Sequence, residues 1–248
     1  SMVGSTEGTH LKNDQVEYVF SEIILESSQA TNSICWLFSE KHSPKLTFFL
    51  TMDCLSQEHG LLFRSTVSLH AVATSEASEN MLREAKIEVT GTKSYGAVLD
   101  GVALNLEKST EISVTGKEAI GYVLKSGTGS NKGTISVTGN VGNTDTTPSL
   151  GFYGEKGTFT NEKEGTISSS GNYANAVALV GNTATGVAFN NKGKIKTEGK
   201  GNIGVYADGK YTFEHDGTDA KISVGTNAVG IYAKNAAGAL NIKAPLDI

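Results

Sequence analysis

The chain has 248 residues and a formal net charge of −5 at pH 7, from 21 Lys and Arg against 26 Asp and Glu. It has no clustered positive charge of the kind that a nucleic-acid groove requires, so nucleic acid is not an expected partner. It also lacks any apolar run of about eighteen residues and a basic start followed by an apolar core, so no membrane span and no secretory signal are predicted.

Composition divides the chain near residue 84. Residues 1–84 contain 3 of the 29 glycines, both cysteines and the only tryptophan. They carry 5 basic and 11 acidic side chains, whereas residues 85–248 carry 16 lysines and 15 acids. We therefore expect a non-repeating β segment over residues 1–84, with residues 1–15 mobile, and a repeat region over residues 85–248.

Stretches rich in apolar, β-branched and aromatic residues predict an antiparallel meander in the first part. These stretches are Val16 to Leu25, which also suits a short buried helix, Ile34 to Phe38, Leu46 to Met52 and Leu61 to Val72. Helix formers after Ser78 predict a short connecting helix over Ser75 to Ala85. The whole segment is expected to cap the repeat region or to form a separate small domain with its own function.

The two cysteines, Cys35 and Cys54, lie on or beside predicted strands. They form a disulfide if the protein is exported to an oxidising compartment, and otherwise a pair of buried free thiols. The histidines of this segment do not fall at metal-site spacing with them, so no zinc site is expected.

From residue 85 onward one pattern recurs, and its fullest copy, Ile195 to Ala207, reads I-K-T-E-G-K-G-N-I-G-V-Y-A. The copies are spaced by 25, 23, 32, 28 and 27 residues, and they open at Ile87, Ile112, Ile135, Ile167, Ile195 and Ile222. Such a period indicates stacked structural units. Within each unit apolar and polar residues alternate, as they do in strands, and no unit contains a long run with helical spacing.

A third short strand can be traced in most units, at Ala103 to Leu106, Thr158 to Thr160, Val187 to Phe189, Tyr211 to Phe213 and Leu240 to Ile242. Three strands per unit, joined by Gly and Asn turns, predict an all-β fold. We expect a parallel, right-handed β-helix of about six coils, which makes a rod about 29 Å long at ~4.8 Å per coil.

Asparagines recur in phase with the isoleucine anchors. Asn131 and Asn191 each begin an N-K-G turn, and Asn161 precedes Ile167 with two extra residues. Asn and Gly tolerate the backbone conformations of tight corners, and asparagines at one corner of successive coils can stack their amides. The sequence therefore predicts a ladder of asparagines along one edge.

The period is stretched at Asn140 to Leu150 and at Asp208 to Lys221, where we expect loops that contact a partner. The candidate partner-binding residues are Asn143, Asp145, Thr147, Tyr153, Tyr211, Glu214, His215 and Asp216. Two alternatives remain open. The aromatic residues can instead stack inside the coil, and the cluster around His215 can be a solvated turn or, less simply, a catalytic group.

Chemistry-bearing residues are sparse in the repeat region, which has no arginine and only one histidine. β-Helical enzymes that cleave sugars need paired carboxylates on one face, and the acids here are isolated. Calcium-binding nonapeptide motifs are also missing. We therefore expect no catalytic residues, no cofactor and no metal.

The pattern I-x-V-T-G followed by G-x-Y, with N-K-G-x-I at the corner, resembles the passenger region of large fusobacterial-type autotransporter adhesins of type V secretion. The resemblance covers residues 85–248 and diagnoses architecture better than partner. It implies a secreted passenger at a bacterial cell surface, held by an outer-membrane barrel, that acts in adhesion or virulence by binding a protein or glycan receptor on another cell.

Three classes of function follow. The chain is expected to be a non-enzymatic, surface-displayed adhesin fragment; the alternatives are a binding module in residues 1–84 carried on a β-helical support, and a β-helical enzyme acting on polysaccharides. The stretch Ala244 to Ile248 has no polar capping residues. We expect either further coils beyond it or pairing of this end with another molecule, and the oligomeric state is left open.

Overall fold

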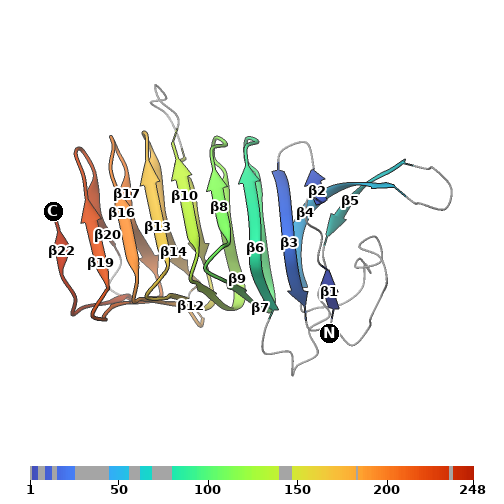
Figure 1. Ribbon diagram of the computed structural model, residues 1–248. Coiled ribbons are helices and arrows are strands. Elements are labelled where there is room, and N and C mark those ends of the chain that lie inside the picture. Colours follow the sequence, from blue (N-terminus) through green and yellow to red (C-terminus); the bar gives the residue numbers. More distant parts are fainter. Residues whose placement is uncertain are drawn as a thin grey trace.

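The architecture is that of a rod built from stacked β coils, with a separate group of strands at its N-terminal end (Figure 1). The computed structural model describes residues 2–4, 9–12, 16–25, 45–55, 62–68, 80–139, 147–182, 184–234 and 237–248. Over these ranges the chain forms strands and turns, and no helix that could cross a membrane is found among them.

Three parallel sheets make up the rod. The first contains β6 (Asn80–Val89), β8 (Glu111–Val114), β10 (Thr134–Thr138), β13 (Thr166–Ser170), β16 (Lys194–Thr197), β19 (Lys221–Val224) and β22 (Leu246–Asp247). The second contains β7 (Tyr95–Leu106), β9 (Ile120–Asn131), β11 (Ser149–Gly154), β14 (Ala174–Gly181), β17 (Ile203–Gly209) and β20 (Val229–Ala233). The third contains β12 (Gly157–Asn161), β15 (Val187–Asn191), β18 (Tyr211–His215) and β21 (Ala239–Ile242), together with the C-terminal halves of β7 and β9.

The isoleucine anchors confirm the predicted repeat. Each anchor is paired in register with the next, from Ile87 with Ile112 through Ile195 with Ile222. All six are fully buried. The chain is therefore a parallel β-solenoid of about six turns, because one apolar column can be buried continuously only when every coil repeats the same register.

Aromatic side chains fill the middle of the rod. Phe159, Phe189 and Phe213 are paired in register on the third sheet, and their neighbouring rings have centroids 5.2 and 5.7 Å apart. Phe152 packs against Phe159 at 4.4 Å. These rings are fully buried and account for much of the apolar area that holds the coils together.

The predicted asparagine ladder is confirmed at the corner between the third and first sheets. Asn131 Nδ2 donates to Asn161 Oδ1 at 3.0 Å, and Asn161 Nδ2 donates to Asn191 Oδ1 at 2.9 Å. Each amide also bonds backbone groups of its own turn, such as the Gly133 carbonyl and N–H for Asn131. All three asparagines are fully buried, so these bonds replace the water that the amides lose on folding.

His215 takes the next place in this ladder. The Asn191 Nδ2 group lies 3.0 Å from His215 Nδ1, and His215 Nε2 lies 3.0 Å from the Pro245 carbonyl oxygen. An amide nitrogen only donates and a carbonyl only accepts, so Nδ1 is the acceptor and Nε2 carries the proton. His215 therefore continues the ladder as a buried structural residue.

The N-terminal strands are β1 (Met2–Gly4), β2 (Thr9–Lys12), β3 (Val16–Leu25), β4 (Lys45–Leu55) and β5 (Leu62–Ser68). β3 pairs antiparallel with β6, and β4 pairs antiparallel with β7 and β5. The antiparallel strands predicted at Val16, Leu46 and Leu61 are thus confirmed. β3 and β4 lie along the open edges of the first coil, and β5 lies beyond β4 (Figure 1).

Two other predictions for this segment have different outcomes. The helix over Ser75 to Ala85 is wrong from residue 80 onward, because Asn80–Val89 forms β6. Pairing of this part of β6 with β3, and of Met81 and Leu82 with β7, outweighs the helical propensity of the sequence. Of the cysteines, Cys54 lies in β4, whereas Cys35 and the strand predicted at Ile34 lie outside the described residues.

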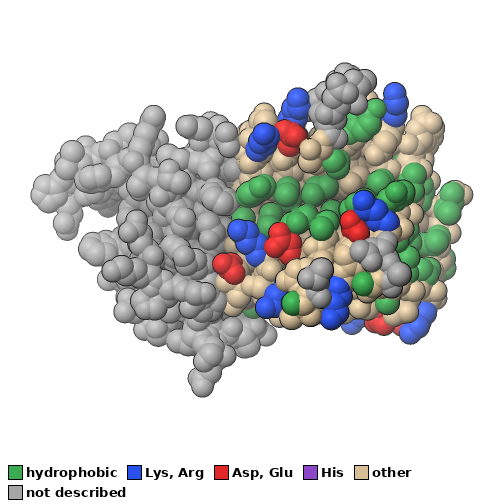
Figure 2. Space-filling view, turned by 180° about the vertical axis from the view of Figure 1, so that it is seen from behind, with side chains coloured by type: hydrophobic (Ala, Val, Ile, Leu, Met, Phe, Trp, Pro, Cys, Tyr) green, Lys and Arg blue, Asp and Glu red, His purple; other side chains and the backbone are tan. Residues whose placement is uncertain are grey.

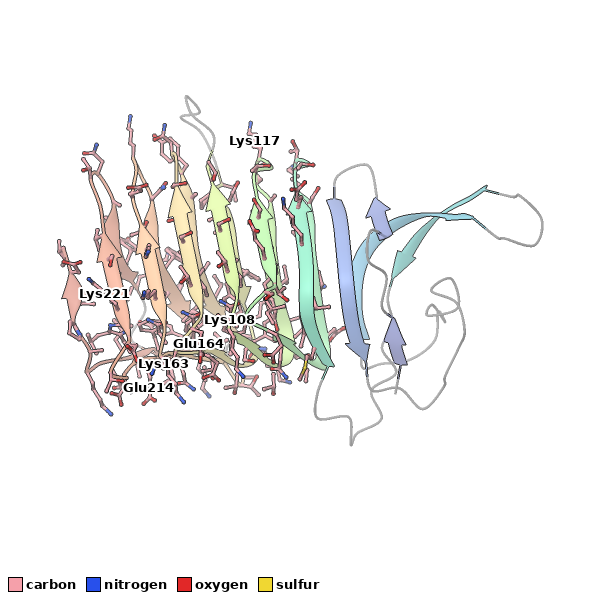
Figure 3. All side chains as sticks on the ribbon, in the orientation of Figure 1. Lys108, Lys117, Lys163, Glu164, Glu214 and Lys221 are labelled. Atoms are coloured by element: carbon pink, nitrogen blue, oxygen red, sulfur yellow. The ribbon has the colours of Figure 1, made fainter. Side chains whose placement is uncertain are left out.

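The far end of the rod exposes part of its apolar columns. Leu246 pairs with Ile222 but is 42% exposed, and Leu240 pairs with Phe213 but is 39% exposed. These positions are buried in the preceding coils, where another coil covers them. Some charged side chains lie at the turns, as Lys117 does at one edge and Lys163 and Glu164 at the opposite edge (Figure 3).

Candidate functional site

The outer faces of the three sheets differ in chemistry. On the first sheet one outward row consists of Glu88, Ser113, Ser136, Ser168, Lys196 and Ser223. On the third sheet the corresponding row consists of Asn105, Ser130, Thr160, Asn190, Glu214 and Asn241. Both faces are polar, as expected for sheet faces in contact with water. The second sheet does not follow this rule.

A local departure from strand alternation shapes the second sheet. In β9, Gly121 and Tyr122 both face inward. A methyl group at Gly121 would lie 3.0 Å from the side chains of Ile112 and Val114, and the Tyr122 ring packs against Phe152 with centroids 5.6 Å apart. Two successive inward residues leave the residues before and after them, Ile120 and Val123, on the outer face.

Because every coil repeats this pattern, the outer face of the second sheet carries two rows that run along the rod. We call these two rows the outer apolar band. The first row consists of Tyr95, Ile120, Leu150, Asn175, Ile203 and Val229, and the second of Val98, Val123, Tyr153, Ala178, Tyr206 and Tyr232. Figure 2 shows hydrophobic side chains gathered along this face of the molecule.

The side chains of the band differ in their exposure to solvent. Val98, Val123 and Ala178 are almost fully buried, at 6, 5 and 3% exposure, whereas Val229 is 47% and Tyr232 is 48% exposed. Tyrosines therefore stand above a floor of smaller side chains. Contiguous apolar surface on one face of an otherwise polar protein marks an interaction site more often than chance exposure does.

Two tyrosines of the band form a stacked pair. The rings of Tyr206 and Tyr232 have centroids 5.8 Å apart and planes that differ by 5°. Lys234 lies next to them, and its pKa is raised, first by a hydrogen bond to Tyr206 and then by the charges of Tyr206 and Asp208. The Lys234 Nζ atom lies 3.7 Å from Asp208 Oδ2, so these two residues form an ion pair beside the stacked tyrosines.

A charged row borders the band on one side. It consists of Lys125, Glu155, Val180, Asp208 and Lys234, each of which directly follows the last inward residue of its strand segment. In β7 a register shift pairs the corresponding residue, Asp100, with Ser126. Both signs of charge occur along it. An apolar centre with a charged margin is the usual composition of a recognition surface.

Tyr153 connects the band to this charged row. Its hydroxyl donates to Glu155 Oε1 at 3.1 Å. Burial, followed by the charge and the hydrogen bond of Glu155, raises the pKa of Tyr153 from 10.0 to about 12. The phenol therefore stays protonated and keeps its donor role through the whole physiological pH range.

A pH dependence of stability follows from this shift. A raised pKa means that the folded state holds the proton more tightly, so the contribution is complete below pH 10 and is lost as the pH rises to about 12. The full shift corresponds to about 2.7 kcal/mol, which partial exposure reduces to about 1 kcal/mol. Between pH 10 and about 12, the free energy of unfolding measured with urea should fall more steeply with pH for the unmodified chain than for Tyr153→Phe. An equal dependence on pH in the two proteins would contradict the role given to Tyr153.

Asn175 is the one polar residue within the two rows. It lies between Leu150 and Ile203 in the first row and is 4% exposed. Its Oδ1 atom has no hydrogen-bond partner, the one such buried side-chain atom found among the described residues. An unpaired buried acceptor is destabilising unless something else requires it.

The residues predicted from the sequence as partner contacts have mixed outcomes. Asn143 and Asp145 lie outside the described residues, and Thr147 is exposed just before β11. Tyr153 lies on the outer apolar band. At the second predicted loop, Asp216 is exposed, and Glu214 lies on the polar outer face of the third sheet, at the edge that also carries Lys163 (Figure 3).

The expectation of a loop over Asp208 to Lys221 is wrong for its central part. Tyr211–His215 forms β18, so Tyr211 and His215 are buried, at 5 and 0% exposure, and cannot contact a partner. The acids around His215 suggested a turn, but alternation within the strand directs Tyr211, Phe213 and His215 inward. The alternative that these aromatic residues stack inside the coil is confirmed for Tyr211.

The band was missed although the sequence contains its signal. Four of the second-sheet segments read I-G-Y-V, L-G-F-Y, I-G-V-Y and V-G-I-Y, beginning at Ile120, Leu150, Ile203 and Val229. Four successive apolar or glycine positions do not fit an alternating strand with one wet face. They indicate an inward pair flanked by two outward apolar residues.

No group of three or more His, Cys, Asp or Glu that could hold a metal ion occurs in the part of the chain that the structure describes.

Comparisons with known proteins define the family. Comparison with curated proteins and with solved structures gives no match. Residues 77–236 match the family model described as BigA third pectate lyase-like domain. Since this match covers more than half of the chain, the protein belongs to the family of BigA third pectate lyase-like domains.

Proposed function

We propose that this domain is a non-enzymatic binding domain, displayed at a bacterial cell surface as part of an autotransporter-type adhesin, and that it contacts a receptor on another cell through the outer apolar band. The observation that carries the proposal is the contrast between the faces: the first and third sheets are polar outside, and the second carries two rows of apolar and aromatic side chains. Surface position and adhesion rest on the resemblance of the repeats to adhesin passengers.

A rigid rod suits this role. Each coil is held to the next by parallel ladders in all three sheets, and the core carries continuous columns of isoleucine and phenylalanine. Side chains on such a scaffold lose little further conformational freedom on binding, so the entropic cost of ordering the binding site is small. Tyrosines are also frequent anchors of binding energy.

The proposal can be tested with fluorescently labelled protein on cultured epithelial cells. The double variant Tyr206→Ser/Tyr232→Ser should bind at least about tenfold more weakly, because two partly exposed aromatic anchors are removed. Lys194→Ser/Lys196→Ser is the matched control, since it changes two exposed residues of the outer polar face of the first sheet. Melting curves should show that both variants fold.

Three outcomes would redirect the proposal. Unchanged adhesion of the tyrosine variant would exclude the band as the contact surface. Loss of adhesion when residues 1–84 are deleted, with adhesion retained by residues 1–84 alone, would favour a binding module in that segment. Release of unsaturated or shortened sugars from polysaccharides incubated with the domain would instead support an enzyme.

A further inference from the structure

The dimensions of the outer apolar band limit its ligand. Six coils at ~4.8 Å make it about 29 Å long, and the three residue steps from one row to the other, at ~3.3 Å each, make it about 10 Å wide. The projected area, about 300 Å², is well below the roughly 800 Å² per partner of a stable protein complex. The band therefore fits a long, thin ligand better than the surface of a globular partner.

The band also has a repeating structure. Equivalent side chains recur once per coil, as Tyr206 and Tyr232 do in adjacent strands of one row. A polymer of similar repeat length that lies along the rod meets the same surroundings at each coil. A linear glycan is such a polymer, because one extended sugar unit is comparable in length to one coil.

Asn175 specifies the chemistry of the ligand further. Its Oδ1 acceptor has no partner and lies within the first row, between two aliphatic neighbours. A purely apolar ligand would leave this acceptor unpaired. Sugars offer apolar C–H faces to tyrosine rings and also carry hydroxyl donors, so they satisfy both parts of the surface.

The charged row favours a neutral ligand. It contains Glu155 and Asp208 against Lys125 and Lys234, and Lys234 is already paired with Asp208. The Tyr153 hydroxyl likewise already donates a hydrogen bond to Glu155. No excess of positive charge is present along this border to attract the carboxylates of acidic sugars.

Building on the proposed function, we propose that the outer apolar band binds a neutral linear glycan lying along the rod, stacked on Tyr153, Tyr206 and Tyr232, with Asn175 Oδ1 accepting a hydrogen bond from a sugar hydroxyl. Asn175 is 4% exposed in the free protein, so this hydrogen bond requires that the side chains around the amide move aside when the ligand binds. The unpaired acceptor is thus a cost of the free state that the ligand removes.

The test uses titration calorimetry of the full chain with cellohexaose, xylohexaose, mannohexaose and laminarihexaose, and with hexagalacturonate as the acidic comparison. At least one neutral hexaose should bind, and more tightly than hexagalacturonate. Tyr206→Ser/Tyr232→Ser should weaken that binding at least about tenfold, and Lys194→Ser/Lys196→Ser should leave it unchanged. Failure of all neutral hexaoses to bind, or equal binding by the tyrosine variant, would overturn the proposal.

Asn175→Leu gives a readout that a purely structural role would not produce. It should raise the melting temperature of the free protein, because it replaces an unpaired buried acceptor by an apolar group, and weaken glycan binding about fivefold, because one hydrogen bond is lost. Unchanged or tighter binding would exclude the role given to Asn175.

Cell adhesion separates this inference from the proposed function. Mild periodate oxidation of the target cells destroys surface sugars and should abolish adhesion. If the tyrosine variant loses adhesion while periodate has no effect, the band is the contact surface and a protein is its partner, so the glycan inference fails alone. If the band binds a hexaose but the tyrosine variant adheres normally, the proposed function fails and the glycan site stands.

Discussion

Asn161→Leu should lower the free energy of unfolding by about 2–5 kcal/mol. Asn161 is fully buried, donates to Asn191 Oδ1 at 2.9 Å and accepts from Asn131 Nδ2 at 3.0 Å. Leucine has a similar size but can neither donate nor accept, so it leaves groups of two neighbouring coils without these partners. Each buried polar group without a partner costs about 1–3 kcal/mol.

Urea denaturation measures this loss, and Asn190→Leu is the matched control. Asn190 lies on the outward, polar row of the third sheet, next to Asn191 in β15, and is only partly buried. The same chemical change should alter stability there by less than about 0.5 kcal/mol. A loss for Asn161→Leu as small as that of the control would show that the ladder does not hold the corner together.

Removal of residues 1–79 should have the second large effect, because we propose that this segment caps the rod. β3 pairs with β6 from Val16 opposite Val89 to Leu25 opposite Asn80, and β4 pairs with β7. Without these strands the edges of β6 and β7 are unpaired, and such edges associate with other chains. We expect residues 80–248 to form oligomers and to melt about 10 °C lower or more, since a loss of about 5 kcal/mol shifts a domain of this size by that much.

Light scattering and thermal unfolding measure these two effects. Removal of residues 1–12 is the control, because β1 and β2 pair with β3 and not with the coils. This shorter deletion keeps β3 paired with β6 and β4 paired with β7, so it should lower the melting temperature much less. If residues 80–248 remain monomeric and keep the melting temperature of the whole chain, residues 1–79 are an independent unit and the proposal of a cap is wrong.

Repetition explains why so much of the fold could be predicted from the sequence. The anchors Ile87 to Ile222, the third strands and the asparagine corner each recur in phase, so a register that buries one isoleucine buries them all. One coil gives a weak signal, but six coils that must share a register exclude most alternatives.

Prediction failed where neighbouring strands decide the outcome. Residues 80–85 have helical propensity, yet pairing with β3 along the segment, and with β7 at Met81 and Leu82, selects a strand. His215 stands between two acids in a segment that resembles a turn, yet it continues the asparagine ladder as a buried residue. Local composition carries no information about which coil lies above or below a residue.

The sequence by itself thus determined the period, the strand content, the inward isoleucine column and the stacked asparagines, because each depends on a pattern that recurs along the chain. Only the tertiary structure decided that two successive positions of each second-sheet segment face inward and that the positions on either side of this pair face outward. That outcome depends on the space inside the rod, where the Tyr122 ring and the Phe152 ring already fill the core at 5.6 Å from each other. The outer apolar band exists because the core has no room for a further row of side chains.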